Sequence, residues 1–157
     1  MKLILCCDYG LDDAAATVDA LAHAADDGYE SVALVAVGGN VPRTVALRNA
    51  MKLAAFLKPK VPVEIVDTTA VAQPEEFLTT IHGNDGMGDL FPTPERTVQT
   101  VPFAEFLREL TGEYDLLSLG PMTLVPRILE RGVCRTFVFM GGNIAEEPNF
   151  HGYEFNH

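Results

Sequence analysis

Basic residues, cysteines and long apolar runs are all scarce in this 157-residue chain. Lys and Arg number 11 against 22 Asp and Glu, so the formal net charge is −11. Such a charge repels phosphate backbones and argues against nucleic acid as a partner. Three cysteines are too few for a disulfide framework, and none has zinc-like spacing with histidine. No uncharged apolar run is long enough to span a bilayer or to form a signal peptide. We therefore expect a cytoplasmic protein that does not act at a membrane.

Two common nucleotide-binding motifs are also missing. The sequence contains neither GxGxxG nor GxxxxGK[ST], which argues against dinucleotide and nucleoside triphosphate chemistry. What it does contain is 48% hydrophobic and 21% charged residues, the composition of a globular domain. The length predicts a single domain over residues 1–157 with a sizeable core.

Strand-like and helix-like segments alternate along most of the chain. Strands are expected at about 3–7, 31–37, 61–66, 114–119 and 136–140, and helices at about 14–25, 43–57, 103–110 and 121–130. Pro126 is expected to kink or shorten the last helix. This alternation predicts an α/β fold, a Rossmann-like and mostly parallel sheet flanked by helices. Residues 67–100 lack clear periodicity, which is typical of a functional or mobile loop.

Carboxylates gather directly after the first expected strand, at Asp8, Asp12 and Asp13. Asp8 follows an apolar run, where a carboxylate needs a partner or a cation. Oxygen ligands without interleaved His or Cys suit a hard cation such as Ca²⁺ or Mg²⁺. A simpler interpretation is that Asp12 and Asp13 cap the following helix, and the sequence leaves both interpretations open. Asn40, Gly120 and Gly141 also follow expected strands, so one sheet edge would carry one site.

The opening resembles the acidic motif DxDxGxDDA of the inosine–uridine-preferring nucleoside hydrolases. Further segments agree with that family in the same order: 37–40 (VGGN), 81–83 (IHG) with 86–89 (GMGD), 119–121 (LGP), and 139–142 (FMGG) followed by 154–156 (EFN). The resemblance covers residues 3–156 and implies a nucleoside hydrolase-like α/β domain. It also implies an enzyme of purine and pyrimidine salvage that hydrolyses the N-glycosidic bond of ribonucleosides to ribose and free base.

The resemblance further implies a calcium cofactor and a set of site residues. Asp8 would bind Ca²⁺ and act as general base toward the Ca²⁺-bound water, with Asp13 and the carbonyl of Leu119 as further metal ligands. The substrate-binding residues it implies are Asp12, Asn40, Glu154 and Asn156 on the ribose hydroxyls, Asn149 and Met140 along the sugar, and His82 in the loop that covers the base.

The chain departs from the family pattern in three respects. Cys6 occupies the position of the leading aspartate, so support of the loop or metal affinity is expected to be weaker. Tyr9 replaces the usual proline and should loosen the turn. Family members are about twice as long, so this chain corresponds to their N-terminal half and should leave an apolar sheet edge uncovered.

Other functions compete with the hydrolase. The departures also fit a non-catalytic nucleoside- or ribose-binding remnant, or an inactive fragment that lacks the C-terminal half. A phosphatase of the haloacid dehalogenase type also places aspartates after its first strand, but its nucleophile would fall at Cys6, where a thiol removes it. The oligomeric state stays open, and a homo-oligomer is compatible with the sequence.

Overall fold

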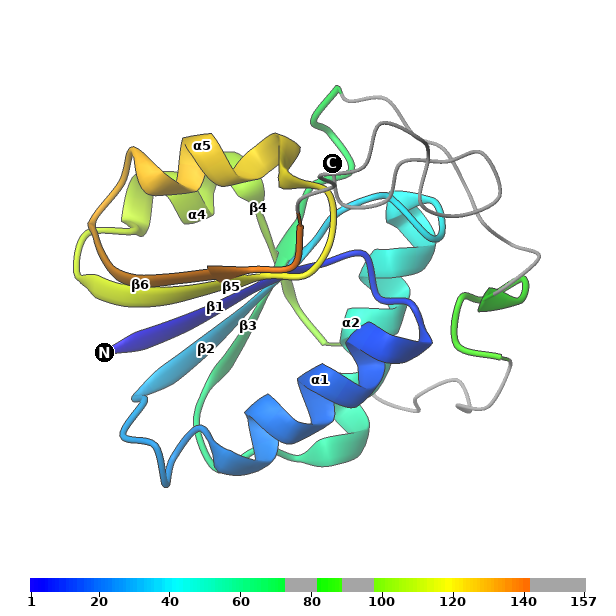
Figure 1. Cartoon of the computed structure of the whole chain (residues 1–157), viewed down its shortest axis with the longest axis horizontal. Helices are drawn as coiled ribbons and strands as arrows, with labels where there is room; N and C mark the ends of the chain where they lie inside the picture. The colour runs from blue at the N-terminus through cyan, green and yellow to red at the C-terminus, as the bar shows by residue number, and fades with distance from the viewer. Residues whose placement is uncertain (73–81, 89–97, 142–157) are drawn as a thin grey trace.

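Strands and helices alternate in the computed structural model, which describes residues 1–72, 82–88 and 98–141 (Figure 1). The strands are β1 (Lys2–Cys7), β2 (Ser31–Ala36), β3 (Val63–Asp67), β4 (Thr100–Pro102), β5 (Glu113–Ser118) and β6 (Val133–Phe139). The helices are α1 (Leu11–His23), α2 (Arg43–Leu57), α4 (Phe103–Glu109) and α5 (Val125–Leu129), with a 3₁₀ turn, η1 (Met122–Leu124), before α5.

All six described strands form one parallel sheet in the order β4-β3-β2-β1-β5-β6. The predicted α/β class and parallel sheet are therefore confirmed. β1 lies in the interior, with Cys6 opposite Val35 of β2 on one side and Ser118 of β5 on the other. The strand order reverses at β1, and in open parallel sheets ligands bind beyond the carboxyl ends of the strands at such a point.

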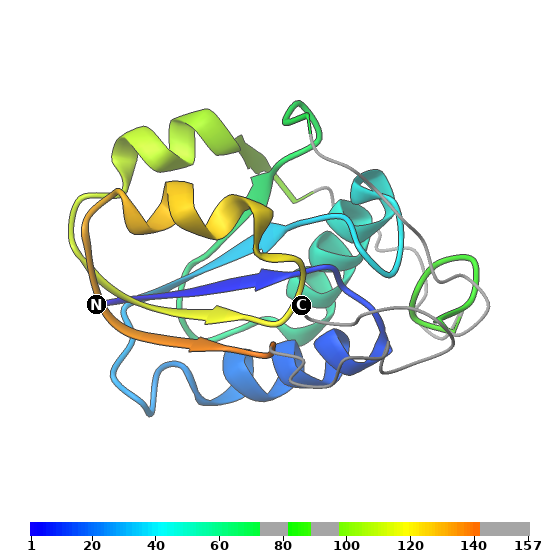
Figure 2. The same ribbon diagram turned by 45° about the horizontal axis from the view of Figure 1, so that its top comes forward.

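Helices cover both faces of this sheet (Figures 1 and 2). Helices α1 and α2 pack on one face and α4 and α5 on the other. Because successive strand residues point to opposite faces, Leu5 and Cys7 of β1 join the α1–α2 core while Ile4 and Cys6 join the α4–α5 core. Burial on both faces explains why β1 and β2 read as uninterrupted apolar runs.

Several boundaries differ from the sequence prediction. Helix α1 begins at Leu11, three residues earlier than predicted, because Asp12 and Asp13 form its first turn. β4 was not predicted, since its three residues are too few to produce a periodic pattern. Pro126 lies in the first turn of α5, which is only five residues long, so the predicted shortening is confirmed.

The outer strand β6 is the least covered part of the sheet. Val133, Val138 and Phe139 are each about half exposed, and Met140 directly after the strand is 43% exposed. The uncovered apolar edge expected from the sequence is thus present. Within the described residues, no helix is long and apolar enough to cross a membrane.

Candidate active site

Asp8 is held at the end of β1 by the turn that follows β2. Its side chain is only 6% exposed. One carboxylate oxygen, Oδ2, accepts the backbone N–H of Asn40 at 2.7 Å, and Oδ1 accepts the Asn40 side-chain amide at 3.0 Å. Gly39 packs so closely that a Cβ there would collide with Asp8 Oδ2. The turns after β1 and β2 therefore hold the carboxylate in one orientation. They meet at one edge of the sheet, as the sequence predicts for residues that follow parallel strands.

Asp13 brings a second buried carboxyl to the same place from the first turn of α1. It is 2% exposed, and its Oδ2 accepts the backbone N–H of Gly10 at 3.3 Å. This contact caps the helix, so the simpler interpretation of Asp13 holds as well. Burial and the neighbouring carboxyl of Asp8 raise the pKa of Asp13 to about 9, with the charge of Asp12 adding to the effect. Two carboxylates in one buried site repel each other unless a proton or a cation lies between them.

Gly10 marks the point where three further predicted site residues converge. A Cβ built on Gly10 would collide with the side-chain amide of Asn40 and lie 3.0 Å from both Asp12 Oδ1 and His82 Nδ1. Asp12 is exposed, whereas Asn40 and His82 are partly buried. The absence of a side chain on Gly10 thus lets a carboxylate, an amide and an imidazole pack close together.

The end of β5 closes the other side of Asp8. The N–H of Leu119 donates to the carbonyl of Cys6 at 3.0 Å, and a Cβ on Gly120 would lie 2.9 Å from the backbone nitrogen of Asp8. Leu119 therefore lies beside the acidic turn, although its role as a carbonyl ligand stays a prediction. Met140 lies one strand further out, where its N–H donates to Ser118 at 2.9 Å. The predicted site residues Asn149, Glu154 and Asn156 lie outside the described residues.

Cys6 does not face this site. Its side chain is fully buried in the α4–α5 core, and burial raises the pKa of the thiol to about 12. Cys7 is buried in the opposite core, and burial likewise raises its thiol pKa. Both are therefore neutral packing residues. Cys134 differs, since it is only partly buried on β6.

Comparison with known proteins identifies the family. The sequence model of the inosine-uridine preferring nucleoside hydrolases matches residues 3–157. This chain belongs to that family.

Individual relatives agree with this assignment. The chain is 31% identical to uridine nucleosidase 1 of Arabidopsis thaliana over 176 residues, which cover 96% of this chain and 50% of the relative. It is 28% identical to a non-specific ribonucleoside hydrolase of Klebsiella pneumoniae, covering 99% of this chain and 54% of that protein. The solved structure of an inosine-guanosine nucleoside hydrolase matches with a TM-score of 0.66 at 28% identity, covering 91% of this chain and 50% of that one. The chain thus spans about half the length of these relatives.

The donor set of the acidic turn fits a hard cation. Asp8 and Asp13 supply buried carboxylate oxygens that repel each other, and oxygen donors of this kind suit Ca²⁺. Among the described residues, no group of three or more His, Cys, Asp or Glu side chains forms a metal-binding cluster. Two carboxylates supply fewer oxygen atoms than the six to eight that Ca²⁺ usually takes. Backbone carbonyls, water or substrate would have to supply the remaining oxygens.

The sequence analysis overlooked Asn49 and misjudged Tyr9, and both residues support the candidate site. Tyr9 is fully buried and has a left-handed backbone with φ of 53°, which proline cannot adopt. Its carbonyl accepts a hydrogen bond from Asn49 of α2 at 3.1 Å, so the turn expected to be loose is anchored. The available signal was Asn49 itself, a polar residue between Ala46, Ala50 and Leu53 on the buried face of the helix.

Proposed function

We propose that this chain provides the metal- and ribose-binding half of a nucleoside hydrolase, which cleaves the N-glycosidic bond of ribonucleosides to ribose and free base with Ca²⁺ as cofactor. The observation that carries the proposal is the buried Asp8–Asp13 pair at the carboxyl edge of the sheet. Family membership supplies the reaction class. The proposal concerns a chain that covers half the length of its relatives.

Asp8, Asp13 and the Leu119 carbonyl are the residues proposed to hold the metal. A bound Ca²⁺ would supply a water of lowered pKa and an anchor for ribose hydroxyls. Asp8 would accept the proton of the attacking water, as a general base must lie within hydrogen-bond reach of it. The two hydrogen bonds from Asn40 support this role, because they fix both oxygens of the Asp8 carboxylate.

The other site residues are proposed to act on the sugar and the base. Loss of the base leaves positive charge on C1′ of the ribose, and interactions that strengthen in that transition state raise the rate. Asp12 and Asn40 meet at Gly10 and suit ribose hydroxyls, and His82 packs beside them there. The residues proposed to complete the sugar site are Met140, Asn149, Glu154 and Asn156.

A second candidate is a nucleoside- or ribose-binding protein without turnover. Cys6 favours it, because a neutral thiol in the α4–α5 core stands where the family motif has a carboxylate. This chain would then keep the sugar contacts without a complete catalytic centre. The predicted cytoplasmic location and an open oligomeric state apply to either candidate.

Ribose release from purine and pyrimidine nucleosides tests both candidates when measured with Ca²⁺ and with a chelator. Chelator-sensitive release that disappears in Asp8→Asn is the result expected of the hydrolase. The matched control is Asp19→Asn, which changes an exposed carboxylate on α1. Calorimetric binding of ribose without release would support the binding protein. If the folded chain neither releases ribose from nucleosides nor binds ribose, both candidate functions are contradicted.

A further inference from the structure

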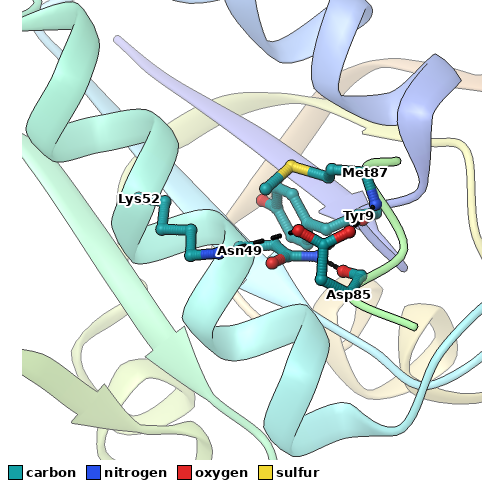
Figure 3. Close-up of polar contacts among 5 residues, drawn as sticks. All are labelled: Tyr9, Asn49, Lys52, Asp85 and Met87. Atoms are coloured by element: carbon teal, nitrogen blue, oxygen red, sulfur yellow. Dashed lines mark hydrogen bonds and ion pairs between the residues drawn. The ribbon is translucent and has the colours of Figure 1, made fainter. Parts of the chain in front are cut away.

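Asn49 links the acidic turn to the segment that carries His82. It lies on α2 and is 1% exposed. Its side-chain nitrogen donates to the carbonyl of Tyr9 at 3.1 Å and to the carbonyl of Asp85 at 2.6 Å (Figure 3). A primary amide has two N–H donors, so one side chain can serve both carbonyls.

Internal hydrogen bonds, a buried side chain and an ion pair help to hold segment 82–88 beside Asn49. Asp85 Oδ1 accepts the backbone N–H of Met87 at 2.8 Å, and the Gly88 N–H donates to the carbonyl of His82 at 3.2 Å. Met87 is fully buried in the α1–α2 core. Lys52, one turn after Asn49 on α2, lies 3.8 Å from Asp85 Oδ2 and adds an ion pair on the same side (Figure 3).

Close packing at Gly86 brings this segment against the helix. Gly86 has φ of 78°, and a Cβ there would collide with Val41 and lie 3.4 Å from the Asn49 amide. At Gly86 the backbone of the segment therefore packs directly against Val41 and the Asn49 amide, which leaves its position sensitive to that amide.

Both carbonyls that Asn49 binds belong to segments of the candidate site. Tyr9 separates Asp8 from Gly10, and the segment containing Asp85 begins at His82, whose ring nitrogen packs close to Gly10. A shift of either segment would change the distance between the carboxylate pair and the imidazole. The two hydrogen bonds of Asn49 go to backbone carbonyls and not to the carboxylate pair or the imidazole.

We propose that Asn49 is a positioning residue that places His82 beside the ribose site, where it can cover the base, by tying the 82–88 segment to the acidic turn. Its importance for ligand binding rests on the proposed function, whereas its anchoring of the segment does not. No step of the reaction uses Asn49 directly.

The anchoring is tested by amide hydrogen exchange in Asn49→Asp, which keeps the size of the side chain but removes both N–H donors. We expect exchange at Met87 and Gly88 to become at least about tenfold faster than in the native chain, the effect of losing about two hydrogen bonds. Asn49→Ala provides a second variant without a buried charge. Leu53→Ala is the matched control, since it removes core volume from the same helix face without removing a donor. Unchanged exchange at both amides in Asn49→Asp and Asn49→Ala would overturn the proposal.

The positioning role is tested by calorimetric titration with ribose and with pseudouridine, a nucleoside whose C–C glycosidic bond is not hydrolysed, in the presence of Ca²⁺. In Asn49→Asp we expect about a tenfold loss of affinity for the nucleoside and a much smaller loss for ribose, because only the nucleoside carries the base that His82 is proposed to cover. Equal losses for the two ligands would indicate general damage to the turn and would contradict the role assigned to His82. A native chain that binds neither ligand would refute the proposed function, and the exchange experiment would then decide the anchoring alone.

Discussion

Replacing Asp13 by Asn should stabilise the metal-free protein while removing its response to Ca²⁺. The physical reason is the buried carboxyl pair, which raises the pKa of Asp13 from 3.8 to about 9. Near neutral pH the folded protein therefore keeps a proton that the unfolded chain has released. Asparagine has the same shape, carries no charge and keeps an oxygen that can accept the Gly10 N–H.

The size of the effect follows from proton linkage. A group whose pKa is higher in the folded state stabilises the fold fully below its unfolded pKa, and that stability is lost as the pH rises through the folded pKa. For Asp13 the loss extends from about pH 4 to about pH 9. At about 1.4 kcal/mol for each pH unit, folding the native chain with this proton at pH 7 costs on the order of 4 kcal/mol. The variant avoids this cost.

Urea unfolding at pH 5, 7 and 8.5 in a chelator measures the prediction. The native free energy of unfolding should fall by up to about 1.4 kcal/mol per pH unit, and the Asp13→Asn curve should be flatter. Saturating Ca²⁺ should raise the free energy of unfolding of the native chain, by about 2.7 kcal/mol at a Ca²⁺ concentration a hundred times the dissociation constant. The free energy of unfolding of Asp13→Asn should not change. Asp19→Asn, which alters an exposed carboxylate, is the control. Equal pH slopes, or a variant less stable than the native chain at pH 8.5 in chelator, would refute the reasoning.

Two further substitution and labelling experiments address the packing of the site. Gly39→Ala should lower stability by about 1–3 kcal/mol and weaken Ca²⁺ binding, because its methyl group would displace the Asp8 carboxylate. Denaturant titration measures the stability and isothermal calorimetry measures the Ca²⁺ affinity. A Ca²⁺ affinity equal to that of the native chain would contradict the assigned contact. In alkylation followed by mass spectrometry at pH 8, Cys6 and Cys7 should stay unmodified in the folded chain, since burial raises both thiol pKa values. Cys134, which is partly exposed, should react ahead of them, and equal labelling of all three would show that the core opens.

The layers of the fold could be predicted from sequence because the interior strands carry a strong signal. β1 and β2 are buried on both faces, and this requirement produces uninterrupted apolar runs. The three residues of β4 are held by neighbours far along the chain and leave no local pattern. The predicted start of α1 at residue 14 is wrong because Asp12 and Asp13, which are also candidate site residues, form the first turn of the helix.

Residue types at strand ends predicted Asp8, Asp13 and Asn40, which the structure brings together. A carboxylate directly after a buried strand needs an explanation, and that need is visible in sequence. The contribution of Asn49 is not visible in the same way, because its partners are backbone carbonyls 40 and 36 positions away. Any residue has a carbonyl, so no residue type at those positions could have indicated the pairing.

Most of the described residues of the candidate site follow interior strands of the sheet. Asp8, Asn40 and Leu119 follow β1, β2 and β5, each paired on at least one side with another described strand. Their positions are therefore fixed independently of the exposed face of β6. Met140, by contrast, follows the outer strand, where Val138 and Phe139 are exposed. Metal binding should accordingly tolerate changes on β6, whereas contacts to the sugar that come from beyond this strand should depend on what covers it.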